Sequence, residues 1–255
     1  MPAQFRLTHL GLLGVLSITA CGTMVDANGA ATLALQTATS PQSAISASER
    51  SLDLNGDQLV ITNVELVARE IELEGNDGAC DDSSDGADSS SVDCNEIEVG
   101  PVLLELPLTP GASQVLSTAV SAGTYHEVKF RIDVPDDDAE DAEFRSAHPE
   151  FTNMSLRVTG TFNGSAFTFT SRVEAEQKLE FAAPLVVGDG TVDLTIFVDV
   201  NRWFLTADGT SLIDPALALA GQPMQAVVEN NIKASFQAFE DHDQDGADDH
   251  SGPGR

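Results

Sequence analysis

Residues 154–173 have the sequence MSLRVTGTFNGSAFTFTSRV, and they are the clearest indication of the fold class. Apolar and polar side chains alternate on both sides of Asn163-Gly164. Alternation indicates two half-buried strands, because successive side chains of a strand point to opposite faces of a sheet. Asn-Gly suits a two-residue type I′ turn, in which both residues take positive φ. The stretch therefore predicts a β-hairpin.

Similar alternation recurs on both sides of this hairpin. The further strand segments are 58–73, 97–108, 114–120, 126–134, 178–187 and 192–200. Within 58–73 the apolar residues change parity, so we expect a bulge or break near residues 67–70. Short connections favour mostly antiparallel pairing. The pattern predicts a mainly β fold, an antiparallel β-sandwich of about seven to eight strands.

The apolar period changes near the C-terminus. Pro223 can open a helix at its first position. The apolar residues that follow share one helical face and are Val228, Ile232, Phe236 and Phe239. We therefore expect a C-terminal amphipathic helix over residues 223–240 that packs on the sandwich. A short helical turn over 201–207 would cover the core with Trp203 and Phe204.

The N-terminus has the composition of a signal peptide. One cation, Arg6, precedes a short apolar run over residues 10–18. This run is too short for a permanent membrane helix, which needs about 20 residues. The next residues, Ile18-Thr19-Ala20-Cys21-Gly22, resemble the lipobox of bacterial lipoproteins. An ordinary secretory signal with an incidental cysteine is the alternative.

The lipobox resemblance implies a location and a membrane partner. In this family of signals the cysteine takes a diacylglyceryl group and becomes the new N-terminus, so Cys21 would carry the lipid anchor. Gly22 stands where an Asp would retain some lipoproteins at the inner membrane, which implies the outer membrane. We therefore expect a protein of the bacterial cell envelope, held to the membrane by lipid.

These observations predict four segments. Residues 1–20 form the signal peptide, and residues 21–50 form the lipidated Cys21 and a flexible tether rich in Ala, Thr and Ser, with a short helix over 32–36 as an option. Residues 51–240 form one sandwich domain with its C-terminal helix. Residues 241–255 form an acidic tail.

The charge of the chain excludes some partners. There are 41 Asp and Glu against 12 Lys and Arg, giving a net charge of −29. Nucleic-acid binding needs cations that neutralise phosphates, so no nucleic-acid partner is expected. The domain surface is equally unsuited to adhesion to anionic lipids. An acidic surface with few lysines would suit a salty environment, where ions screen the repulsion.

Three cysteines are accounted for by two different roles. If Cys21 is lipidated, Cys80 and Cys94 remain as a pair in a compartment that permits disulfides. We expect them to form a disulfide that closes the Asp- and Ser-rich segment between them. Two free thiols or soft-metal ligands are the alternatives.

The strongest metal motif lies in the tail. Asp241, Asp243, Asp245 and Asp249 occupy positions 1, 3, 5 and 9 of a calcium loop, with Gly246 at position 6 for the sharp turn and Ala247 at position 7 for a backbone carbonyl. The motif resembles the calcium repeats of dockerins and thrombospondin-type tails, and it directly follows the predicted helix. Position 12 is Gly252 instead of a bidentate Glu. A further ligand would have to come from the domain or from water, and a solvated acidic tail is the alternative.

A shorter echo of this spacing lies at residues 53–57, where a polar turn is the simpler interpretation. His126 lies on the apolar parity of its strand, which favours a structural histidine over a ligand or a base. The chain contains no Ser elbow, HExxH, P-loop or dinucleotide fingerprint. Its many acids leave a glycosidase pair open without indicating one.

The order of elements resembles uncharacterised bacterial lipoproteins that carry a transthyretin-like or related β-sandwich of unknown function. The resemblance rests on residues 63–73, 100–106 and 122–134. It implies no activity and no functional residues. We expect a non-catalytic envelope lipoprotein with a binding or structural role, whose partner would be an envelope protein or a glycan. A calcium-dependent adhesion or carbohydrate-binding module and an unrecognised hydrolase are the alternatives.

Overall fold

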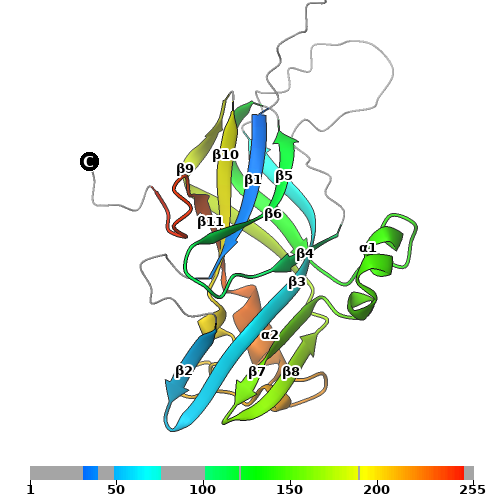
Figure 1. Ribbon diagram of the computed structural model, residues 1–255, viewed down its shortest axis with the longest axis vertical. Helices are drawn as coiled ribbons and strands as arrows, with labels where there is room; N and C mark the ends of the chain where they lie inside the picture. The colour runs from blue at the N-terminus through cyan, green and yellow to red at the C-terminus, as the bar shows by residue number, and fades with distance from the viewer. Residues whose placement is uncertain (1–30, 40–48, 76–100, 121, 189, 250–255) are drawn as a thin grey trace, which may run out of the picture.

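The computed structural model describes residues 31–39, 49–75, 101–120, 122–188 and 190–249 (Figure 1). In this part of the chain eleven strands form two sheets. The strands are β1 (Ala31–Ala38), β2 (Arg50–Leu54), β3 (Asp57–Gly75), β4 (Val102–Glu105), β5 (Ala112–Val120), β6 (Gly123–Ile132), β7 (Leu156–Phe162), β8 (Ser165–Ser171), β9 (Ala175–Val187), β10 (Thr191–Val198) and β11 (Phe236–Glu240). The α-helices are α1 (Ala142–Ala147) and α2 (Gln225–Lys233), and the 3-10 helices are η1 (Pro149–Phe151), η2 (Val200–Arg202) and η3 (Pro215–Leu217).

The two sheets confirm the predicted mainly β fold. The smaller sheet has the strand order β11-β10-β1-β5, and the larger has the order β8-β7-β3-β6-β9, with β2 and β4 also paired to β3. The main apolar cluster draws its buried side chains from strands of both sheets and from α2. Strand pairing is antiparallel except for β1 and β10, which run parallel. The chain thus forms a β-sandwich with more strands than the sequence pattern indicates.

The predicted hairpin is present as β7 and β8. Its turn places Asn163 at φ 49° and Gly164 at φ 78°, as a type I′ turn requires. Strand pairing runs without a break from Phe162 opposite Ser165 to Leu156 opposite Ser171. The Asn163 side-chain oxygen also accepts a hydrogen bond from the Gln58 backbone N–H at 2.8 Å, which ties this turn to the start of β3.

Strand β3 runs along almost the whole molecule and contains the predicted bulge. It has 19 residues and pairs first with β7 and then with β6 (Figure 1). The register with β6 shifts between Arg69 and Glu72, and Glu70 takes φ 49°, a left-handed conformation that favours glycine. The extra residues at the bulge explain why the apolar parity changes in this strand.

Strand β1 corrects the expected tether. Residues 31–38 were expected in a flexible segment with an optional short helix, but they form a middle strand of the smaller sheet. Leu33 and Leu35 are buried on one face and Ala34 and Ala38 on the other. A strand covered on both faces shows no alternation of polar and apolar residues, and for this reason the sequence pattern misses it. The domain therefore begins before residue 51.

The C-terminal helix is shorter than expected. Helix α2 ends at Lys233, and its buried residues are Val228 and Ile232. Phe236 and Phe239 belong instead to β11, which pairs with β10. The chain leaves the helical path at Ser235, whose carbonyl accepts a hydrogen bond from the Asp199 N–H at 3.0 Å and so begins the pairing with β10.

The predicted cover over the core is confirmed near residues 201–207. Helix η2 is followed by Trp203 and Phe204, which are both buried. The Trp203 indole Nε1–H donates to the Ser235 hydroxyl at 2.8 Å, and this satisfies its buried polar group. No helix among the described residues has the length and apolar character needed to span a bilayer.

Candidate metal centre

The acidic loop at residues 241–249 follows strand β11, whereas the apolar pattern of the sequence predicts a helix before it. Its backbone turns sharply where Gln244 takes φ 58° and Gly246 takes φ 79°. Gly246 is at the loop position where the calcium-loop pattern requires a glycine. The loop therefore keeps the tight turn of the motif while lacking the entering helix.

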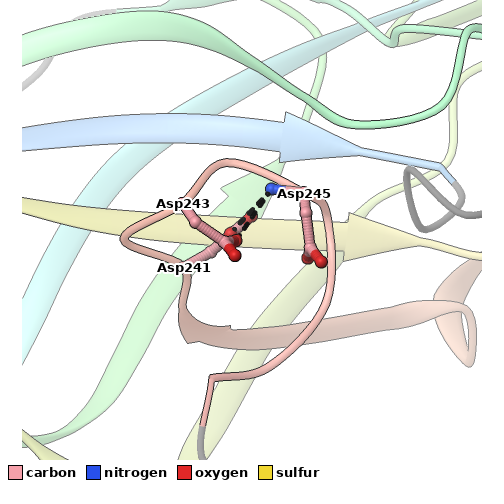
Figure 2. A group of neighbouring side chains, drawn as sticks. All are labelled: Asp241, Asp243 and Asp245. Carbon is pink, nitrogen blue, oxygen red and sulfur yellow. Dashed lines mark hydrogen bonds between the residues drawn. The ribbon is translucent and has the colours of Figure 1, made fainter.

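The turn brings three of the predicted ligands together. Asp241, Asp243 and Asp245 each offer a carboxylate oxygen, and these oxygens lie within 4.8 Å of one another (Figure 2). Oxygen ligands of Ca²⁺ lie at about 2.3–2.6 Å from the ion, so two ligands of one ion are at most about 5 Å apart. The spacing of the three carboxylates is therefore compatible with a shared cation.

Asp241 is the buried member of this group. Its side chain is 0% exposed and accepts hydrogen bonds from the N–H groups of Gly246 at 2.9 Å and Asp245 at 3.0 Å. The Thr195 hydroxyl on β10 also donates to it, at 3.2 Å. Burial raises the pKa of Asp241 above its ordinary value, while these hydrogen bonds oppose the rise. A cation beside the carboxylate would favour its ionised form.

The other two predicted ligand positions lie differently. The Asp249 carboxylate accepts a hydrogen bond from the His242 N–H at 2.7 Å and is outside the group of three. The Ala247 N–H donates to the Asp245 carboxylate at 2.8 Å. Asp249 therefore fastens the two ends of the loop to each other, while Asp241, Asp243 and Asp245 supply the cluster of charge.

The loop is attached to both edges of the smaller sheet. The Asp241 N–H donates to the Asp193 carbonyl on β10 at 3.4 Å, and the Asp249 N–H donates to the Glu240 carbonyl on β11 at 3.3 Å. At the other edge the Ala112 N–H at the start of β5 donates to the Gln244 carbonyl at 3.1 Å. The loop thus packs on the sandwich as part of the fold. The prediction that residues from 241 onward form a separate acidic tail is wrong for residues 241–249.

Gln36 on β1 is a polar residue beside this site that sequence reasoning missed. It lies opposite Thr195 in the parallel pair of β1 and β10, so the two side chains share a face of the sheet. Gln36 is only 1% exposed, and its Nε2 donates to the Asp193 carboxylate at 2.9 Å. Its Oε1 is buried without a hydrogen-bond partner among the described residues. An orphaned acceptor oxygen of this kind is suited to a cation or an ordered water.

The shorter echo at residues 53–57 is the turn between β2 and β3. The Asp53 carboxylate accepts a hydrogen bond from the Gln58 side-chain amide at 3.0 Å, and the Asp57 carboxylate accepts one from the Asn163 amide at 2.8 Å. These carboxylates are therefore engaged in holding two turns together, as the polar-turn interpretation predicts.

A groove of about 560 Å³ adjoins the acidic loop. It lies between β9 and β11, two strands at the edges of different sheets, and its apolar lining includes Phe197, Phe236 and Phe239. Residues 246–248 of the loop line the same groove. The conformation of the loop and the shape of this groove are therefore coupled.

Several predicted residues lie outside the described part of the chain. These are Cys21, Cys80, Cys94 and Gly252, together with the rest of the signal peptide and of residues 250–255. The lipid anchor and the disulfide remain predictions from the sequence.

Comparisons with known proteins add no relative. A scan against protein-family models found no match, and searches of curated proteins and of solved structures also returned none.

Proposed function

We propose that the protein is an exported lipoprotein of the bacterial envelope with a non-catalytic binding or structural role. The observation that carries this proposal is the segment Ile18-Thr19-Ala20-Cys21-Gly22, placed directly after a short apolar run. The domain that follows suits an exposed position in water, because its net negative charge favours solubility and its apolar side chains pack in the sandwich. Two or three acyl chains would anchor it firmly, since each buried CH₂ contributes about 0.8 kcal/mol.

The lipid anchor is tested by replacing its cysteine. Cys21→Ala should leave the chain unprocessed and release the domain from washed membranes, whereas Cys80→Ser/Cys94→Ser should keep the acyl groups and the membrane fraction. The measurements are the mass of the mature protein and its distribution between membrane and soluble fractions. A Cys21→Ala protein that is processed and membrane-bound like the wild type would refute the anchor.

We further propose that the loop at residues 241–249 binds one calcium ion. The ligand atoms would be the carboxylates of Asp241, Asp243 and Asp245 and the Ala247 carbonyl, with water completing the shell. All of these are oxygens, which Ca²⁺ prefers, and the three acids carry the negative charge that a cation would neutralise. The orphaned Oε1 of Gln36 on the same face of the sheet supports the fit. An affinity in the millimolar range is typical of extracellular calcium modules.

Thermal unfolding with and without calcium tests this site. A ligand at ten times its Kd stabilises the folded state by about 1.4 kcal/mol, which corresponds to a rise of about 3–5 °C in Tm for a domain of this size. Asp243→Asn and Asp245→Asn should abolish the rise, and Asp248→Asn, outside the group of three, should keep it. A wild-type Tm that calcium leaves unchanged at constant ionic strength would exclude the site.

A calcium-dependent carbohydrate-binding module is the second candidate. The groove beside the loop favours it, because Phe197 and Phe239 lie side by side with ring centroids 6.3 Å apart, and aromatic rings provide apolar surfaces on which sugars pack. The soluble domain should then be retained on immobilised polysaccharides in calcium and released by a chelator. Phe197→Ala should lose this retention, and equal retention of the variant would oppose this candidate.

A further inference from the structure

The first described residues of β1, which follow Cys21 in the sequence, lie at one end of the sandwich. Thr32 of β1 lies opposite Thr191 of β10, and Ala31 lies opposite Val120 of β5. Gly123 of β6 lies opposite Val187 of β9 at the same end. We call this end the N-terminal pole, and Figure 1 shows it at the top. Its described residues are 31–32, 75, 119–120, 122–124, 186–188 and 190–191.

The opposite end is built from three tight turns. Asn55-Gly56 joins β2 to β3, Asn163-Gly164 joins β7 to β8, and Asp208-Gly209 lies in the loop after η2. The Asn55 side-chain amide donates to the Thr210 carbonyl at 2.5 Å, and the Asn163 side chain bonds to the start of β3, so the turns are tied to one another. We call this end the three-turn tip. Strand β3 connects the two ends.

Covalent lengths limit how an anchored domain can face a membrane. Ten residues lie between Cys21 and Thr32, and the eleven steps from one to the other span at most about 40 Å when fully extended. The 19 residues of β3 rise about 3.3 Å each, so the strand covers about 60 Å between the tip and the pole. An inverted domain, with its tip on the bilayer, would hold the pole farther from the membrane than the anchor can reach.

Charge distinguishes an upright domain from one that lies flat. None of the described pole residues is charged, and Val186 at the pole is 65% exposed. One face of the larger sheet carries five acids against three cations across β3, β6 and β9, so it is net negative; the acids are Glu72, Glu74, Glu127, Glu176 and Glu180, and the cations are Lys129, Arg131 and Lys178. Laying such a face on a bilayer would bring carboxylates to a surface that is itself negative, which is unfavourable.

We infer that the lipid anchor holds the sandwich upright, with its N-terminal pole toward the bilayer and its three-turn tip pointing away. This inference rests on the lipid anchor proposed above. It assigns the pole to a lipid surface and leaves the tip as the end presented to any partner beyond the membrane.

Energy transfer from single labels to the membrane surface tests the orientation. The full lipidated chain, with Cys80 and Cys94 changed to Ser, receives one new cysteine at either end: Gly188→Cys at the pole or Ser165→Cys at the tip. Both positions are exposed, and a side chain at Gly188 would meet nothing within 4 Å. Each variant carries a donor dye and is inserted into vesicles with an acceptor on the lipid headgroup. Transfer from the pole label should be several-fold stronger than transfer from the tip label.

Two vesicle compositions and one mass measurement separate the outcomes. Phosphatidylcholine vesicles test the geometric limit, and vesicles with phosphatidylglycerol add the repulsion of the acidic faces and of the eight acids in residues 76–100. Equal transfer from both labels, stronger transfer from the tip, or weak transfer from both would overturn the orientation while the lipid anchor stands. A mature protein whose mass shows no lipid on Cys21 would overturn the anchor and the orientation together.

Discussion

At the scale of single residues, Asp241 carries the most unusual electrostatic environment in the described loop. Its carboxylate is buried against β10 while Asp243 and Asp245 stand close by. Burial and like charges both disfavour ionisation, whereas a bound cation would reverse the balance. Ionised Asp241 can therefore destabilise the loop when no cation is bound and stabilise it when a cation is bound.

The raised pKa of Asp241 predicts a dependence of stability on pH in metal-free buffer. The folded state binds this proton more tightly than the unfolded chain, whose ordinary value is 3.8. Protonation of Asp241 therefore stabilises the folded state. This contribution is fully present below pH 3.8 and is lost as the pH rises through the higher folded-state pKa. Between pH 3.8 and the folded-state pKa, denaturant unfolding should show the free energy of unfolding of wild type falling relative to that of Asp241→Asn. A constant difference between the two proteins would contradict the assignment.

The ion pair between Glu65 and Arg157 links β3 to β7 at the residue scale. Arg157 donates to both carboxylate oxygens at 2.6 Å, and its guanidinium lies 5.0 Å from the centre of the Phe151 ring. The hydrogen bond to Glu65, which is itself 5% exposed, raises the pKa of Arg157. Removing one charge from a largely buried pair leaves the other without its partner.

Glu65→Gln is therefore expected to destabilise the protein by about 1–3 kcal/mol, a value lowered from the fully buried case because Arg157 is partly exposed. The matched control is Glu150→Gln, since the Glu150 carboxylate is 3.9 Å from the same guanidinium and well exposed. Urea unfolding of both variants measures the difference. Equal loss in the two variants would show that the short bidentate contact has no special weight.

At the scale of elements, strand β1 is the clearest case of a segment that the fold needs and local sequence does not reveal. It pairs with β10 on one side and with β5 on the other, so it joins both halves of the smaller sheet. Without it, β5 would lose its strand partner in this sheet, and the edge of β10 that pairs with β1 would be left with unpaired backbone N–H and C=O groups.

Two deletions test the role of β1. Removal of residues 22–29 leaves β1 intact and should preserve cooperative unfolding, whereas removal of residues 22–39 should abolish it. Circular dichroism and thermal unfolding of the soluble domains measure both outcomes. A cooperative transition in the longer deletion would mean that the smaller sheet is stable without its middle strand.

At the scale of the whole molecule, the net charge of −29 sets how the protein responds to salt. Like charges across the surface repel, and added salt screens them over a distance of about 10 Å at 0.1 M. Potassium chloride should therefore raise the Tm by several degrees at neutral pH. Near the pI of about 4.1 the same salt should have little effect, because the net charge is small. A salt response of equal size at both pH values would contradict the electrostatic origin.

The local features of this protein could be predicted from its amino-acid sequence. They are the β7–β8 hairpin from Asn163-Gly164, the bulge of β3 from its change of parity, and the spacing of the three aspartates. Each of these follows from neighbours in the chain, because side-chain period, turn residues and loop spacing are local properties.

Strands β1 and β11 and the surroundings of the acidic loop, in contrast, depend on contacts between distant parts of the chain. Gln36 and Asp193 are 157 residues apart, yet they are hydrogen-bonded neighbours across β1 and β10. Phe236 and Phe239 match a helical stripe in sequence but are buried in a strand through pairing with β10. Long-range pairing covers both faces of β1 and buries Asp241 against Thr195, and no local pattern encodes which distant strand supplies that cover.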